Sequence, residues 1–353
     1  MYSFKNDYSV GAHPSILKAL LDTNETQQQG YGQDDYSLLA TDLIRDKLQN
    51  QASDVHLVSG GTQANLTVIS SILKPYQSVI SAVTGHINHM ETGAIEATGH
   101  RIETIPTPNG KLTPALIEAF MDTLMPVHMR IPKLVYISNS TEIGTHYTRN
   151  ELIALWDFCK QKDMFLFMDG ARLASGLDAG DITFPDLAKY TDVFYIGGAK
   201  NGALLGEAIV INNADIKADF SYNLKLRGAL LAKGRLLGIQ FVELFRDDLY
   251  FKIGAHLNRM AALLTKGISQ LGYSFSTNSK TNQIFPILPY AIIRQLEQKY
   301  DFYVWEKLDN EKAIVRLVTN WAMSEAIIEQ FIADLAECSV NTYKLERELC
   351  LQD

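Results

Sequence analysis

Two runs in the middle of the chain contain only apolar or aromatic residues. They occupy residues 164–168 and 193–196, five and four positions in a row. Uninterrupted runs of this length are typical of strands that are buried on both faces of a parallel sheet. Apolar residues spaced three and four positions apart at 37–50 and 151–160 predict amphipathic helices that cover such a sheet. The pattern therefore predicts an α/β architecture.

Each of the two buried runs leads to a charged residue. Asp169 follows the first run directly, and Lys200 follows the second within a glycine-rich segment, 31 positions after Asp169. Open α/β sheets bind ligands at the carboxyl ends of their parallel strands. A lysine and a carboxylate there suit pyridoxal 5'-phosphate (PLP), because the amine bonds to the cofactor aldehyde and the carboxylate keeps the pyridine nitrogen protonated. Taken singly, Asp169 could cap a helix and Lys200 could be a solvated loop residue.

A third strand end provides a candidate phosphate site. The strand predicted at 55–58 is followed by Gly60, Gly61 and Thr62, and then by an apolar helix at 66–73. Free N–H groups and the helix dipole attract a phosphate to such an N-terminus, and the Thr62 hydroxyl can donate a further hydrogen bond. An ordinary helix N-cap would show the same pattern. The segment is not a P-loop, because the Gly-Lys-Ser/Thr ending is absent.

The residues at 167–172 (Phe-Met-Asp-Gly-Ala-Arg) and 197–200 (Gly-Gly-Ala-Lys) resemble motifs of the threonine aldolases, fold-type I PLP enzymes within the β-eliminating lyase superfamily. The resemblance extends from about residue 4 to about residue 325. It implies a fold-type I large domain with a mostly parallel sheet, at 1–245. The alternation of helices and short strands after about residue 253 predicts a smaller C-terminal α+β domain, at 246–353. Residues 1–36 would lie at the mouth of the active site.

The resemblance also implies an activity and a set of site residues. The enzyme would be a carbon–carbon lyase that cleaves L-threonine or L-allo-threonine to glycine and an aldehyde. Its catalytic residues would be Lys200, His86 and Asp169, with His86 stacked on the PLP ring. PLP contacts are expected from Gly61, Thr62, His86, Asp169, Arg172, Lys200 and Arg235. Substrate contacts are expected from Arg316, Arg172, Tyr31 and Glu91.

One segment departs from the family pattern. Threonine aldolases usually carry Glu-Asn-Thr-His where this chain has Ser-Asn-Ser-Thr at 138–141. The family asparagine aligns with Asn139, so the family histidine falls at or near Thr141. That histidine is often assigned to the proton of the substrate β-hydroxyl. Glu142, His146, His86 or a bound water could take its place.

Arg316 lies inside a predicted apolar strand at 314–319. An unpaired charge is costly to bury, so we expect this arginine to face an anion in a cleft. The resemblance implies that this anion is the substrate α-carboxylate. A partly exposed arginine on an edge strand is the alternative.

Composition and charge argue against two classes of partner, and the resemblance implies that the remaining partner is a small-molecule amino acid. The net charge of −8 argues against nucleic acid, and no apolar run approaches the 18 residues of a membrane span. The three cysteines, Cys159, Cys338 and Cys350, show neither metal-ligand spacing nor a disulfide framework. We therefore expect a cytoplasmic protein without a metal site. The resemblance implies a homodimer or homotetramer, with Arg235 reaching the phosphate from the neighbouring subunit in some family members.

Two other functions fit the same residues. PLP also supports β-elimination and transaminase-type reactions, and the placement of the base decides among them. A binding protein that keeps the fold without turnover is the second alternative, although it would have little reason to keep both Lys200 and Asp169.

Overall fold

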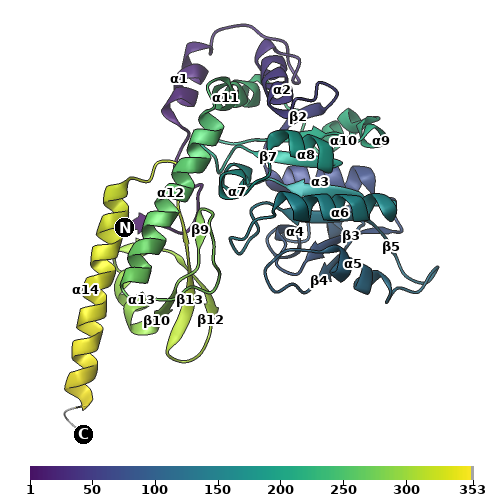
Figure 1. Ribbon diagram of the computed structural model, residues 1–353. Helices are drawn as coiled ribbons and strands as arrows, with labels where there is room; N and C mark the ends of the chain where they lie inside the picture. Colours follow the sequence, from purple (N-terminus) through teal and green to yellow (C-terminus); the bar gives the residue numbers. More distant parts are fainter. Residues whose placement is uncertain (351–353) are drawn as a thin grey trace.

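The two apolar runs form the centre of a seven-stranded sheet (Figure 1). We describe a computed structural model with the backbone of residues 1–350 and the side chains of residues 1–341. The strand order is β2-β8-β7-β6-β5-β3-β4, and only β8 runs antiparallel to its neighbours. The strands are β2 (Asp54–Val58), β3 (Gln77–Ala82), β4 (Arg101–Ile105), β5 (Ile131–Ser138), β6 (Phe165–Asp169), β7 (Val193–Gly197) and β8 (Glu207–Ile211).

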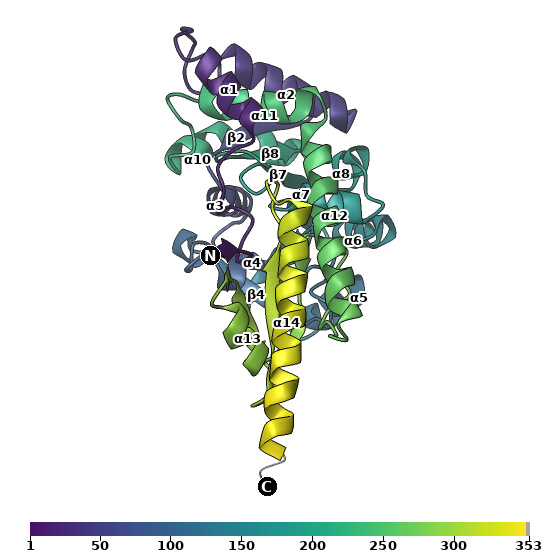
Figure 2. The ribbon, with the colours of Figure 1, turned by 90° about the vertical axis from the view of Figure 1, so that its left-hand side faces the viewer.

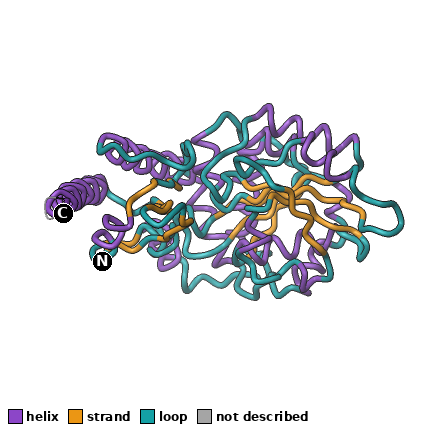
Figure 3. Tube along the Cα trace, turned by 90° about the horizontal axis from the view of Figure 1, so that it is seen from below, coloured by secondary structure: helices purple, strands orange, loops and turns teal. Residues whose placement is uncertain are grey.

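Helices cover both faces of this sheet (Figure 3). Alternate residues of one strand enter different cores: Leu166 and Met168 of β6 pack on one face, and Phe167 packs on the other. The continuous apolar run in the sequence is explained by this double burial. The helices of this part are α1 (Pro14–Asp22), α2 (Asp35–Leu48), α3 (Gly61–Ile72), α4 (His86–His89), η1 (Glu96–Thr98), α5 (Pro114–Met121), α6 (Arg149–Gln161), α7 (Leu173–Ala179), α8 (Phe184–Tyr190), α9 (Ala214–Lys217), α10 (Phe220–Leu226) and α11 (Arg235–Arg246).

A second, smaller sheet lies in the C-terminal part of the chain. Its strands pair antiparallel in the order β10-β13-β12, and β9 also pairs with β13. The elements are α12 (Leu249–Gln270), β9 (Gln283–Ile284), β10 (Ile287–Pro289), α13 (Tyr290–Leu296), β11 (Tyr300–Asp301), β12 (Tyr303–Lys307), β13 (Lys312–Val318) and α14 (Glu325–Cys350). Within residues 1–350, no helix combines the length and apolarity needed to cross a bilayer.

The first residues of the chain pack with this second part (Figure 2). Strand β1 (Tyr2–Ser3) pairs with β11, and Phe4 is fully buried in the core that the C-terminal elements share. Helix α12 contributes to both cores, through Ile253 and Leu257 to the large one and through Leu264 to the small one. The division of the chain at residue 245 stays a prediction.

Candidate active site

Asp169 ends β6 and is almost completely buried. Its Oδ2 accepts hydrogen bonds from the Tyr136 hydroxyl and from the Asn65 amide, the latter at 3.2 Å. Its Oδ1 accepts the backbone N–H of Ala171 at 2.9 Å. These donors come from β5, α3 and the loop after β6, so three elements fix one carboxylate.

His86 and two tyrosines keep Asp169 ionised. Burial raises the pKa of this carboxyl, but His86 and the hydroxyls of Tyr136 and Tyr195 outweigh it and leave the pKa below its ordinary value. The Tyr195 hydroxyl also lies near Gly61, because a Cβ atom placed there would meet it at 3.1 Å. The carboxylate is therefore connected to the start of α3 through Tyr195.

The start of α3 has the form of an anion site. Gly60 precedes the helix with extended backbone, and no side chain caps its first N–H groups. Thr62 is exposed at the second position of the helix. The Gln63 side chain is bound to the Ser59 N–H and hydroxyl and therefore leaves the helix end open. Uncapped N–H groups and the helix dipole suit a phosphate.

Lys200 lies in the turn that follows β7. Burial lowers the pKa of its amine, and the nearby Arg172 lowers it further, while Asp7, Asp169 and Glu207 act in the opposite direction. The net effect is a lowered pKa. A lowered pKa increases the neutral, nucleophilic fraction of the amine, which is what bonding to an aldehyde requires.

Close backbone contact positions this turn beside the loop that carries Arg172. A Cβ atom at Gly197 would lie 2.4 Å from the carbonyl oxygen of Ala171, so only glycine fits there. The Asn201 amide donates to the carbonyls of Gly197 at 2.6 Å and Ala171 at 3.3 Å. The ends of β6 and β7 are thereby held together, with Lys200 and Arg172 on adjacent segments.

A cavity of about 1070 Å³ opens above these strand ends. Four of the predicted site residues line it: His86, Arg172, Lys200 and Arg316. Its other lining residues are Tyr8, Thr84, His89, Met90, Glu142, Ile143, Ser276, Thr277, Gln283, Phe285, Tyr303, Val304, Trp305, Glu306 and Ile314. This volume can hold a cofactor and a small substrate together.

His86 opens α4 on the wall of this cavity. Burial lowers the pKa of its imidazole to about 4; Asp169 opposes this shift, and Lys200 and Arg172 strengthen it. The ring is therefore neutral near pH 7, and a neutral imidazole is suited to stacking on another aromatic ring. Its Nε2 lies 3.9 Å from Oε1 of Glu91.

Glu91 is buried behind His86 and does not line the cavity. Burial raises the pKa of its carboxyl to about 7, although a hydrogen bond from the Asn65 amide at 2.8 Å acts against this shift. Its Oε2 has no hydrogen-bond partner. Asn65 thus bridges Glu91 and Asp169 beneath the site.

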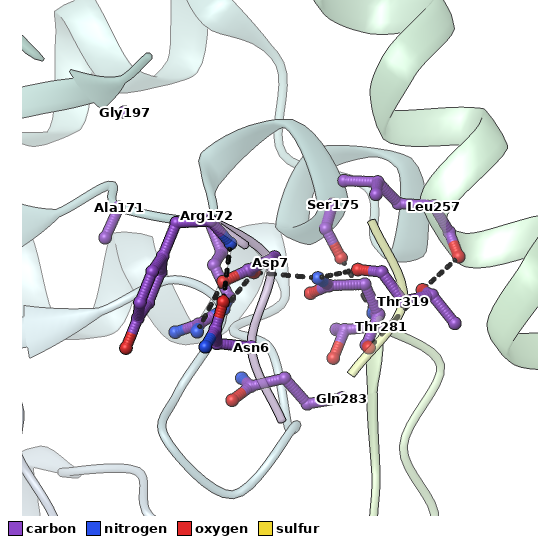
Figure 4. Close-up of polar contacts among 12 residues, drawn as sticks. Asn6, Asp7, Ala171, Arg172, Ser175, Gly197, Leu257, Thr281, Gln283 and Thr319 are labelled. Carbon is purple, nitrogen blue, oxygen red and sulfur yellow. Dashed lines mark hydrogen bonds and ion pairs between the residues drawn. The ribbon is translucent and has the colours of Figure 1, made fainter. Parts of the chain in front are cut away.

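Arg172 is paired with Asp7, a residue that the sequence did not single out (Figure 4). Its Nε and Nη2 donate to the two Asp7 oxygens at 2.7 and 3.0 Å, and the Asn282 amide donates to Asp7 at 3.0 Å. Burial raises the pKa of Asp7, but Arg172 and Lys200 outweigh it and leave the pKa lowered. The charge of Arg172 is therefore largely neutralised within the chain.

Arg316 on β13 has no such partner. Its Nη2 donates to the Lys5 carbonyl at 3.1 Å, and its guanidinium lies over the rings of Tyr303 and Trp305, 5.1 and 4.8 Å from their centroids. Among the described residues no carboxylate forms an ion pair with it, and its buried Nε has no acceptor. Burial lowers its pKa to about 10, so the guanidinium is still a cation at neutral pH.

Comparisons with known proteins agree with this geometry. A family model described as "Beta-eliminating lyase" matches residues 11–290. The chain belongs to the β-eliminating lyase family.

Individual members of the family and of its fold extend the match. The chain is 31% identical to the "Low specificity L-threonine aldolase" of Pseudomonas sp. (strain NCIMB 10558), over 94% of this chain and 96% of that protein. It is 47% identical to a solved threonine aldolase of Leishmania major, with a TM-score of 0.94 over 96% of this chain and 99% of that chain. An aspartate aminotransferase of Thermus thermophilus, 16% identical with a TM-score of 0.68 over 96% and 91% of the two chains, shares the fold alone. The predicted resemblance and fold class are confirmed.

Six of the expected site residues do not line the cavity: Asp169, Gly61, Thr62, Glu91, Tyr31 and Arg235. The last two make other contacts. Tyr31 is half exposed, with the Lys225 ammonium 4.5 Å from its ring centroid. Arg235 opens α11 and donates to the carbonyls of Thr23 and Thr26. Their predicted contacts with substrate and phosphate stay predictions.

The structure also shows partners that sequence reasoning missed. Asp7 carried no local signal, because it meets Arg172 across 165 positions of sequence. Tyr136 and Tyr195 did carry one, since each is a tyrosine within a buried, mostly apolar part of a strand. A buried tyrosine hydroxyl needs a hydrogen-bond partner, and Asp169 is the partner of both.

Proposed function

We propose that this protein is a PLP-dependent aldehyde-lyase that cleaves L-threonine or L-allo-threonine to glycine and acetaldehyde. The observation that carries this proposal is the pair of Lys200 and Asp169 on adjacent strand ends beneath one cavity. The buried amine and the ionised carboxylate are the two groups that PLP requires of a protein. The L-threonine aldolases among the relatives support this choice of reaction.

The residues present fit the cofactor. The uncapped N-terminus of α3, with Gly61 and Thr62, would hold the phosphate, and Lys200 would hold the aldehyde carbon. Asp169 would hold the pyridine nitrogen as a protonated N–H, and neutral His86 would stack on the ring. When bound, PLP supplies an electron sink for the pair released at the substrate Cα.

The substrate carboxylate would be held by Arg316. Arg172 is already paired with Asp7, whereas Arg316 has a cationic guanidinium on the cavity wall and a buried Nε without an acceptor. Cation–π contacts with its two aromatic neighbours hold the guanidinium at the cavity, and its planar fork suits a bidentate contact with a carboxylate. This contact would orient the amino acid so that its Cα–Cβ bond can be placed across the ring plane.

We extend the proposal to a homo-oligomer in the cytoplasm. Large apolar side chains are exposed on and around α1, α2 and α10, which lie at the same end of the molecule (Figure 2). These are Leu17, Leu21, Leu38, Leu39, Tyr222 and Leu226. A second copy of the chain that covered this end would bury them and would also contact the neighbourhood of Tyr31 and Arg235.

An assay of aldehyde release tests the activity. Purified protein loaded with PLP is given L-threonine or L-allo-threonine, and acetaldehyde is followed with a coupled alcohol dehydrogenase. We expect acetaldehyde and glycine in equal amounts. A yellow protein that releases 2-oxobutyrate and ammonia instead would replace the proposal with β-elimination.

A further inference from the structure

The structure leaves the substrate β-hydroxyl without the base that the family usually supplies. Thr141, at or near the position of the family histidine, is buried and does not line the cavity. Its Oγ1 is bonded to the Thr145 hydroxyl at 2.7 Å. Another group must therefore receive the proton when the Cα–Cβ bond breaks.

We propose that the Glu142 carboxylate is this catalytic base and accepts the proton of the substrate β-hydroxyl. The proposal rests on the proposed aldehyde-lyase function. It gives the Glu142 carboxylate a role that Thr141, the preceding residue in the sequence, cannot fill.

The geometry carries this assignment. Glu142 follows β5 and lines the cavity together with Lys200 and His86. Its Oε1 accepts the backbone N–H of His86 at 3.0 Å and the Ser138 hydroxyl at 2.7 Å. Two donors on one oxygen fix the carboxylate, and among the described residues no side chain donates to Oε2.

Electrostatics supports the same role. Burial raises the pKa of Glu142 to about 7; Ser138 opposes the shift, and the charge of Asp169 adds to it. A base with a pKa near the operating pH combines an available ionised form with adequate strength. The pKa of His86, lowered to about 4 by burial, makes that ring a much weaker base at neutral pH.

The remaining histidines fit less well. His146 does not line the cavity and lies against Gly180, where a Cβ atom would meet its ring at 2.9 Å. His89 lines the cavity, but it is exposed and its Nε2 lies 3.0 Å from the Asn88 amide. Neither is fixed by two donors as Glu142 is.

The step balances in atoms and electrons. The β-hydroxyl proton moves to Glu142, the O–H pair becomes the second bond of the aldehyde carbonyl, and the Cα–Cβ pair stays on Cα. A proton then adds to Cα, which yields glycine, and Glu142 returns to its ionised form by releasing the proton that it accepted.

The test separates cleavage from amino-acid binding. Glu142→Gln keeps the shape and removes the base, so we expect kcat for aldehyde release to fall by about 10²–10³-fold. Glycine has no β-hydroxyl. Its dissociation constant, from the change in cofactor absorbance, and the exchange of its α-proton in D₂O should therefore stay near the wild-type values. A merely structural role would change these readouts as well.

Three further variants complete the design. Glu142→Asp keeps an ionisable group on a shorter side chain and should retain more activity than Glu142→Gln. It also tests the inference if the glutamine variant folds poorly. Glu329→Gln, on the exposed face of α14, is the matched control and should leave kcat unchanged. His89→Asn should lower kcat for aldehyde release by a smaller factor than Glu142→Gln does.

Each possible result has a defined reading. Cleavage by Glu142→Gln within about threefold of wild type overturns the inference, because general base catalysis contributes far more than that. A larger loss in His89→Asn than in Glu142→Gln would also overturn it and assign the base to His89. A wild-type protein that releases no aldehyde would instead disprove the proposed function, so the two failures are distinguishable.

Discussion

The floor and the roof of the cavity are constructed in different ways. The floor, defined here as Asp169 with its hydrogen-bond partners, lies at the ends of the parallel strands next to the residues that line the cavity. It satisfies both carboxylate oxygens within the chain. The roof, defined as Arg316 with Tyr303, Trp305 and the Lys5 carbonyl, joins the small sheet to the N-terminal segment. It leaves the buried Nε of Arg316 without an acceptor.

This difference indicates separate tasks for the two regions. A carboxylate that is fully hydrogen-bonded before any ligand arrives is preorganised to hold a charge in one place through the reaction. A guanidinium with an open donor gains its hydrogen bonds only when an anion binds. We therefore expect changes in the floor to lower kcat and changes in the roof to raise KM.

The largest expected effect is that of Lys200→Ala. Removing the Lys200 amine from the cavity wall should abolish aldehyde release, a loss beyond about 10³-fold. Borohydride reduction of the wild-type holoenzyme should fix the cofactor to a peptide that contains Lys200. The control is Lys225→Ala, an exposed lysine outside the cavity. A labelled peptide that contains Lys225 would contradict the assignment.

Asp169→Asn tests the floor itself. The amide keeps the shape but cannot hold the pyridine nitrogen protonated, so we expect kcat to fall by about 10²–10³-fold with KM nearly unchanged. Steady-state kinetics with L-threonine or L-allo-threonine measure both constants. A rise in KM with unchanged kcat would show that Asp169 belongs functionally to the substrate-binding roof.

Arg316→Lys tests the roof. Lysine keeps the charge but loses the planar fork that stacks on the two rings, so about 2 kcal/mol or more of substrate binding should be lost. We expect this loss as a rise in KM and in the dissociation constant of glycine, with kcat little changed. Arg294→Lys, on the exposed face of α13, is the control. A fall in kcat at constant KM would remove the distinction between the two regions.

The floor could be predicted from the sequence because its signals are local. An apolar run that ends in Asp169 and another that leads to Lys200 place both residues at one edge of the sheet. The structure places His86 and Arg172 on the same cavity by the same logic, since each follows a strand of that sheet.

The roof could be predicted only in part, because its contacts are long-range. Arg316 was detectable as a charge within an apolar strand, but its contact with the Lys5 carbonyl spans 311 positions. The pairing of Asp7 with Arg172 leaves no periodic pattern either. Tyr31 and Arg235 do not line the cavity of the single chain, so their roles stay predictions.

The smallest expected effect comes from the contact between Asp7 and Arg172. Asp7→Asn keeps an acceptor but removes the charge, so we expect a loss of about 1.5–3 kcal/mol of unfolding free energy and about a tenfold fall in kcat/KM. Burial opposes the lowered pKa of Asp7, but Arg172 and Lys200 dominate. The pair therefore stabilises the fold above the ordinary aspartate pKa. This stabilisation disappears as the pH falls through the lowered value.

Asp301→Asn provides the matched control in the same part of the structure. Asp301 also pairs with the N-terminal segment, through Lys5 at 3.3 Å, but both side chains are more than a third exposed. An exposed pair contributes about 1 kcal/mol or less, so urea unfolding should show a clearly smaller change than in Asp7→Asn. Equal changes in the two variants would mean that the N-terminal segment acts only as a tether. A larger change in Asp7→Asn, with a difference between the two variants that disappears at acidic pH, would show that the buried charge pair couples the roof to the floor.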